Sequence, residues 1–126
     1  MWNSITIEEL NKEIQSSIDI MTNEELNFWQ LIKIEPEKWE EDQFGDKGNG
    51  FWVVAILGKR VIWYNDIEEG FNISEYEVYK KIDGYYCNQD KLIWAINRLN
   101  NLAKFGGNIV NQVGPPKPLA NYNDKS

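Results

Sequence analysis

The residues of this chain that could do chemistry are mainly carboxylates. The 126 residues contain twenty Asp and Glu, no His and a single Cys. Histidine is the commonest general base and the commonest metal ligand, so its absence removes the Ser-His-Asp and Cys-His arrangements of many hydrolases. Nothing close to Cys87 in the sequence would activate its thiol, and we expect a structural cysteine. We therefore predict a protein that is not an enzyme.

One group of acidic residues follows a strongly apolar stretch. Asp66, Glu68 and Glu69 come directly after it, next to Tyr64. Paired carboxylates with different pKa values can cleave a glycosidic bond, and exposed Trp rings can stack on sugars. An acidic turn after a strand is more often simply a turn. A carbohydrate-processing enzyme or a sugar-binding module is therefore an alternative, and not the favoured function.

The acidic residues are concentrated in the first third of the chain. Residues 1–46 hold twelve acidic and three basic residues, so they carry −9 of a total charge of −7, and the remainder carries +2. Phosphate backbones are bound by clustered Lys and Arg, so we expect no nucleic acid partner. Acidic surfaces instead steer encounter with basic proteins. The contact residues that we predict first are Glu40, Glu41, Asp42 and Asp46, followed by Asp66, Glu68 and Glu69.

These features favour a small acidic protein-binding module. An immunity or inhibitor protein that neutralises a basic toxin, such as a nuclease, needs these properties. No phosphate-binding glycine motif, zinc spacing or EF-hand spacing occurs, so we expect no cofactor and no metal. No apolar run is long enough for a membrane helix, and the first ten residues lack the character of a signal peptide. We expect a cytoplasmic protein that binds no membrane.

The element that must position these residues is a hairpin over Phe51–Asp66. Two apolar runs flank Gly58-Lys59, which suits a type II′ turn. That turn predicts the cross-strand pairs Leu57/Arg60, Ala55/Ile62, Val53/Tyr64 and Phe51/Asp66. Both faces of the hairpin are apolar, so we expect it in the middle of a sheet and covered on both sides. Trp52 and Trp63 share one face, where they are either core residues or the interface of a structural homo-oligomer such as a homodimer.

Helices are predicted near both ends of the chain. Apolar residues at spacings of three and four, after a capping box of Thr6 and Glu9, predict a helix over about residues 7–20. A second periodic stretch predicts a helix over Gln89–Phe105, capped by Asn88. Thr22 and Glu25 repeat the capping pattern, but 28–34 also alternates as a strand does. We predict a helical turn at 23–26 and a strand from 28, with a continuing helix as the alternative.

The remaining segments complete an α+β prediction. Pro36 should end the element before it, 39–44 should form an acidic edge strand, and 45–50 a loop. Residues 71–79 alternate as a less buried strand. We expect one α+β domain over residues 1–111, an antiparallel β-meander of four to five strands with an N-terminal and a C-terminal helix packed on it. Residues 112–126 should form an extended, Pro-containing C-terminal arm.

Overall fold

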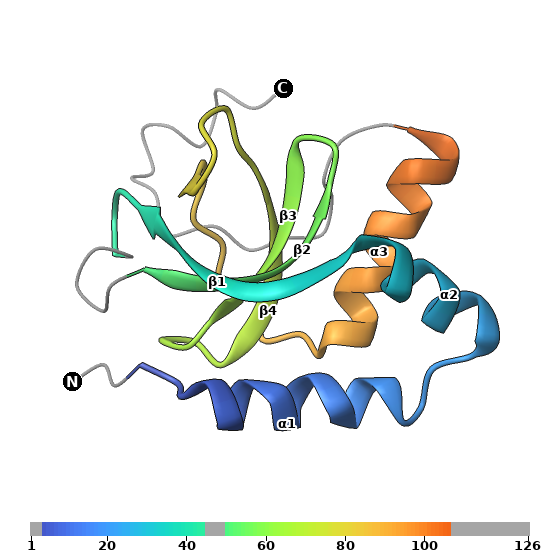
Figure 1. Ribbon diagram of the computed structural model, residues 1–126. Helices are drawn as coiled ribbons and strands as arrows, with labels where there is room; N and C mark the ends of the chain where they lie inside the picture. Colours follow the sequence, from blue (N-terminus) through green and yellow to red (C-terminus); the bar gives the residue numbers. More distant parts are fainter. Residues whose placement is uncertain (1–3, 45–49, 107–126) are drawn as a thin grey trace, which may run out of the picture.

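The computed structural model describes residues 4–44 and 50–106 (Figure 1). The elements follow in the order α1 (Ile7–Ile18), α2 (Asn23–Ile32), β1 (Lys33–Glu41), β2 (Phe51–Leu57), β3 (Arg60–Asn65), β4 (Gly70–Glu75), β5 (Lys81–Ile82) and α3 (Leu92–Phe105). The strands form one sheet in the order β4-β3-β2-β1-β5. The fold class is α+β, as predicted, but the sheet is mixed because β5 pairs with β1 in parallel. The predicted arm at 112–126 lies outside the described residues.

The predicted hairpin is formed by β2 and β3, and β2 is the central strand of the sheet. Gly58 has φ 60°, as the first position of a type II′ turn requires, and Leu57/Arg60 and Ala55/Ile62 pair as predicted. Beyond Ala55 the register shifts, so that Val53 pairs with Trp63 and Trp52 with Tyr64. The predicted pairs Val53/Tyr64 and Phe51/Asp66 are therefore wrong. The extra residue of a β-bulge exchanges the faces of all residues before it.

Local capping explains where the first two helices begin. Thr6 with Glu9 and Thr22 with Glu25 both form complete capping boxes, as the sequence predicts. The second helix continues to Ile32, however, so the predicted strand from residue 28 is wrong. Trp29 and Ile32 are buried against the other helices and the sheet, and this packing favours the helical alternative.

Strand β1 passes through Pro36 rather than ending before it. The register of β1 against β2 shifts between Lys33 and Glu37, which accommodates a residue without an N–H group. Of the edge strand predicted over 39–44, residues 39–41 are the end of this longer strand and residues 42–44 form a turn. The predicted edge position is wrong, because β1 lies between β2 and β5.

Two further boundaries differ from the sequence prediction. Helix α3 begins at Leu92 without a side-chain cap. The side-chain amide of Asn88 donates to the carboxylate of Asp90 instead, while the backbone N–H and carbonyl of Asn88 bond the side chain of Asn72. Strand β4 is more buried than predicted, since residues 70–74 are all buried. None of the helices in the described ranges has both the length and the apolar character needed to cross a membrane.

Both faces of the sheet are covered, as the apolar hairpin predicts. All three helices pack on one face, where the core includes Leu10, Trp29, Ile62 and Leu99. Figure 1 shows α1 below the sheet and α2 and α3 beside it. The opposite face carries a separate aromatic core, formed by the buried residues Trp39, Phe51, Val53, Val61, Trp63, Ile82 and Tyr85. The segment after β4 covers this second core.

Candidate binding site: an acidic pocket

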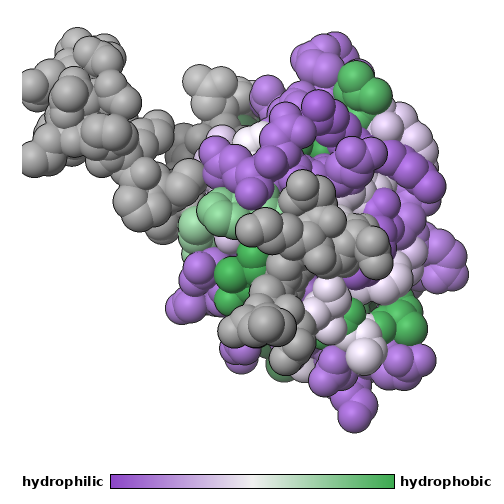
Figure 2. Space-filling view, turned by 90° about the vertical axis from the view of Figure 1, so that its left-hand side faces the viewer, coloured by the Kyte–Doolittle hydropathy of each residue, from purple (hydrophilic) through white to green (hydrophobic). Residues whose placement is uncertain are grey.

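The two predicted groups of acidic residues lie at the same end of the sheet. Because β1 to β4 are antiparallel, the end of β1, the start of β2 and the β3–β4 turn meet there. This end is on the left in Figure 1 and faces the viewer in Figure 2, where hydrophilic residues cover much of the coloured surface. The topology therefore brings together carboxylates that are about 25 positions apart in the sequence.

The group at the end of β1, predicted first, is only partly accessible. Glu41 is 3% exposed, and its carboxylate accepts hydrogen bonds from the backbone N–H groups of Gln43 (3.1 Å) and Phe44 (2.7 Å). It is buried and bonded to the turn, and this argues against its predicted role as a contact residue. Asp42 forms an exposed ion pair with Lys81 at 3.4 Å. Glu40 is exposed, and Asp46 lies outside the described residues.

The second group lies beside a pocket between helix α1 and the β3–β4 turn. The pocket has a volume of about 510 Å³ and is lined by Ser4, Ile5, Glu9, Lys12, Glu13, Tyr64, Asp66 and Glu69. Four of these residues are acidic and one is basic. Asp66 and Glu69 were predicted as contact residues, whereas Glu68 is partly buried and does not line the pocket. We name these eight residues the acidic pocket.

Hydrogen bonds hold the start of α1 against the turn. The carboxylate Oδ2 of Asp66 accepts from the backbone N–H of Ile5 at 2.7 Å. The indole N–H of Trp52 donates to the carbonyl of Ile5 at 3.1 Å. Ile5 is therefore bonded on both sides by the hairpin, and this places the first turn of α1 beside the carboxylates of the β3–β4 turn.

The capping box orients the first carboxylate of α1. Glu9 Oε1 accepts hydrogen bonds from the backbone N–H of Thr6 at 3.0 Å and from its hydroxyl at 3.1 Å. These bonds, the backbone one first, lower the pKa of Glu9 below its ordinary value. Glu9 is therefore ionised at neutral pH. Glu13 follows one turn later on the same helix face.

The β3–β4 turn is held by Asn65, which is fully buried. Its side-chain oxygen accepts from the N–H groups of Ile67 (3.0 Å) and Glu68 (3.2 Å), and its amide donates to the carbonyl of Tyr86 at 2.9 Å. The carbonyl of Asn65 accepts from the N–H of Glu69 at 2.7 Å. Glu69 is exposed and has φ 62°, a conformation that non-glycine residues adopt at a cost. The backbone thus holds this carboxylate at the pocket.

Tyr64 lines the pocket from the sheet. It is 6% exposed, and its ring packs edge-on against Phe71 with centroids 4.8 Å apart. Burial raises the pKa of the phenol to about 12, and the carboxylates that add to this effect are those of Glu13, Glu69, Asp66 and Glu9. The phenol is therefore neutral at physiological pH. Within residues 4–44 and 50–106 its hydroxyl makes no hydrogen bond to another protein group.

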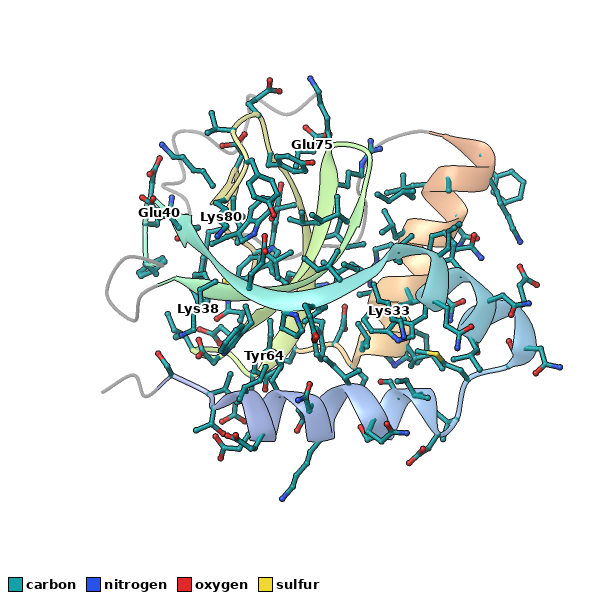
Figure 3. The ribbon with its side chains drawn as sticks, in the orientation of Figure 1. Lys33, Lys38, Glu40, Tyr64, Glu75 and Lys80 are labelled. Atoms are coloured by element: carbon teal, nitrogen blue, oxygen red, sulfur yellow. The ribbon has the colours of Figure 1, made fainter. Side chains whose placement is uncertain are left out.

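Figure 3 separates the pocket from the end of β1. It labels Tyr64 directly above α1, whereas Glu40 lies beyond the middle of β1 near Lys80. The backbone N–H of Glu40 donates to the carbonyl of Lys80 at 2.9 Å, so this end of β1 belongs to the β5 side of the molecule. Glu40 is not part of the lining of the acidic pocket.

The pocket does not have the geometry of a metal site. Across the part of the chain that the structure describes, no three His, Cys, Asp or Glu side chains converge closely enough to hold a metal ion. Lys12 lies among the carboxylates, and its charge acts on Glu9. The arrangement suits a larger organic cation, which can contact carboxylates that are spread over a pocket wall.

The predicted aromatic interface is not an accessible surface. Trp63 is fully buried, its indole N–H donates to the hydroxyl of Ser74 at 2.9 Å, and Phe51 packs on it at 4.7 Å between centroids. Of the two interpretations of Trp63, a core residue or part of an interface, its burial in the aromatic core favours the first. Trp52 is partly buried, and the ammonium group of Lys38 lies 5.1 Å from its ring centroid. The β-bulge puts these two indoles on opposite faces.

Cys87 has the properties of a structural residue. It is partly buried against the aromatic core. Burial, with a smaller effect of the Glu68 carboxylate, raises the pKa of its thiol. The thiolate therefore forms less readily than in an ordinary cysteine, as expected for the structural cysteine that the sequence predicts.

Comparison of the chain with protein-family models, with curated proteins and with solved structures finds no match. The acidic pocket is the described feature on which a function can be proposed.

Sequence reasoning missed Glu9 and Glu13 as site residues, since Glu9 was assigned to the capping box alone. The sequence feature that could have identified them is their spacing of four residues, which places the two carboxylates on one exposed helix face.

Proposed function

We propose that this protein is a non-catalytic module that binds a basic protein through the acidic pocket and the neighbouring exposed carboxylates. The observation that supports this most directly is the pocket lining, which contains two acidic residues of α1, two of the β3–β4 turn and one lysine. An immunity or inhibitor protein against a basic toxin, such as a nuclease, is the specific form that we favour. Its place of action would be the cytoplasm.

The physical basis is electrostatic complementarity. Carboxylates held by backbone hydrogen bonds need little reorganisation when a cationic side chain approaches. A surface of one sign also raises the association rate, and this effect falls steeply with salt. Carboxylates can further occupy a site that a nuclease has built for phosphates, which would block its activity.

The two alternative functions receive less support from the geometry. A homo-oligomer joined through the second hairpin face would need Trp63, which is buried beneath the aromatic core. A carbohydrate-processing enzyme would use the same pocket carboxylates, but neither nearby ring is an open platform for sugar stacking. Tyr64 is buried and packs on Phe71, and Trp52, which bonds Ile5, lies against Lys38. We therefore place the binding module first.

The test is neutralisation of a basic toxin. Basic toxins encoded beside the gene of this protein would be co-expressed with it, and we expect growth to be rescued by the wild-type protein. Rescue should be lost with the double variant Glu13→Gln/Glu69→Gln and kept with Glu8→Gln, which removes an exposed charge of α1 outside the pocket. The association rate with the rescued toxin should fall steeply with NaCl. A rescue that survives the double variant, or a rate that is insensitive to salt, would contradict the proposal.

A further inference from the structure

The acidic pocket combines features that together select among cations. Its carboxylates come from two sides, Glu9 and Glu13 from helix α1 and Asp66 and Glu69 from the β3–β4 turn. A volume of about 510 Å³ is within the usual range of small-ligand pockets and accommodates a whole side chain. The exposed carboxylates of the lining are those of Glu9, Glu13 and Glu69, because Oδ1 of Asp66 is buried and its Oδ2 bonds the N–H of Ile5.

The second observation is the hydroxyl of Tyr64. It is a polar group on a residue that is more than nine-tenths buried, it lines the pocket, and no protein group of the described residues bonds it. The hydroxyl oxygen itself is not one of the buried unbonded side-chain atoms of the described residues, so it is open to the pocket, where a ligand can reach it. A ligand that supplies an N–H group to the phenol oxygen would satisfy it.

We infer that the acidic pocket receives one guanidinium group, the head of an arginine side chain that the basic partner inserts between α1 and the β3–β4 turn. This inference rests on the proposed function and names the chemistry that the pocket recognises. A guanidinium group has five N–H donors in a planar fork, so it offers donors in several directions to the carboxylates of the pocket wall and to the Tyr64 hydroxyl. An ammonium group has three donors at one point and reaches fewer of these acceptors.

Lys12 distinguishes cation binding from a purely structural role of the pocket, because only cation binding predicts a change in affinity when Lys12 is replaced. Its ammonium group is the basic group of the pocket lining and opposes an incoming cation. Replacing Lys12 by Gln removes this opposition and should strengthen guanidinium binding by roughly two- to fivefold, the effect of one partly screened charge. A pocket that does not bind cations would not respond.

The experiment is a titration of the purified protein with N-acetyl-arginine amide, followed by NMR signals of the Tyr64 ring and of the first turn of α1. We expect saturable shifts at these positions. N-acetyl-lysine amide and spermidine should bind at least about threefold more weakly, and the neutral isostere N-acetyl-citrulline amide should not bind. Tyr64 is assigned from the variant Tyr64→Phe, which must unfold cooperatively to be used.

Variants complete the test. Glu13→Gln/Glu69→Gln should weaken binding of the arginine amide by roughly three- to tenfold, and Glu8→Gln should leave it unchanged. Equal binding of citrulline, or tighter binding of spermidine, would overturn the inference. If the arginine amide does not bind while the toxin is still neutralised, the inference fails and the proposed function stands. Loss of toxin neutralisation in the proposed-function test would remove both.

Discussion

At the scale of single residues, Tyr64 joins the core to the surface. One side of its ring packs on Phe71 inside the helix-covered core, and its hydroxyl lies at the acidic pocket. Burial, and then the surrounding carboxylates of the pocket, raise the pKa of the phenol, so the residue stays neutral far above pH 7. A neutral hydroxyl among carboxylates is able to contact a cation without adding to the charge that must be desolvated.

The raised pKa of Tyr64 predicts a loss of stability at high pH. The ordinary pKa of 10.0 applies in the unfolded chain, whereas the folded value is about 12. Between these values the unfolded state releases the proton first, so the free energy of unfolding falls as pH rises from about 10 to about 12, by roughly 2–3 kcal/mol from this group. Urea unfolding at several pH values should show this decrease in the wild type and a smaller one in Tyr64→Phe. Parallel pH curves for the two proteins would contradict it.

Replacing Glu69 by Gly is expected to raise the free energy of unfolding and to weaken binding of the arginine amide. Its φ of 62° is strained for a residue with a side chain, and Glu69→Gly should stabilise the fold by about 0.5 kcal/mol in urea unfolding. Lys80→Gly is the matched control, because Lys80 has φ 74° and does not line the pocket. Both variants should gain stability, and only Glu69→Gly should bind the arginine amide more weakly. An equal effect of both on binding would show that Glu69 has no special role.

At the scale of elements, β4 depends on a close contact with the segment that precedes α3. The backbone N–H of Phe71 donates to the carbonyl of Asp90 at 2.8 Å, and a Cβ atom on Gly70 would lie 2.2 Å from the carbonyl oxygen of Asn88. No flexible side chain can relieve that contact, because the obstructing atoms belong to the backbone. Glycine at this position therefore allows the end of the β3–β4 turn to dock on the segment before α3.

This contact predicts different effects for two glycine substitutions. Gly70→Ala should lower the free energy of unfolding by about 3 kcal/mol or more, because the neighbouring backbone must move. Gly58→Ala should cost only about 1 kcal/mol, since Gly58 has φ 60° but nothing within 4 Å of an added Cβ. Chemical denaturation of both variants measures the difference. Similar losses of unfolding free energy in the two variants would show that the backbone at 88–90 moves at little cost.

At the scale of the whole molecule, the arrangement of the two cores bears on self-association. The helices cover one face of the sheet, and the segment after β4 covers the other, so the hairpin has no open apolar face. We therefore expect the protein alone to sediment as a monomer of 14.8 kDa from micromolar to millimolar concentration. A mass that rises with concentration would favour the homo-oligomer instead. Trp63→Glu should unfold the protein rather than dissociate it, because it buries a charge in the aromatic core.

The sequence by itself determined the features that depend on near neighbours. Both capping boxes, the start of α1, the type II′ turn at Gly58 and the central position of the hairpin follow from residue types at short spacing. The continuation of α2 to Ile32 does not, because residues 28–34 suit both periodicities. Burial of Trp29 and Ile32 against the other helices and the sheet decided between them.

Only the tertiary structure decided which carboxylates form the site. The bulge before Ala55 exchanged the faces of Trp52 and Val53, and the bonds of Ile5 to Asp66 and Trp52 placed α1 over the β3–β4 turn. Glu9 and Glu13 became site residues through that contact, whereas Glu41 was buried by the turn that it stabilises. An acidic residue carries its charge wherever it lies in the sequence, but its accessibility and its neighbours depend on contacts between distant segments. Residue type and local spacing do not specify such contacts.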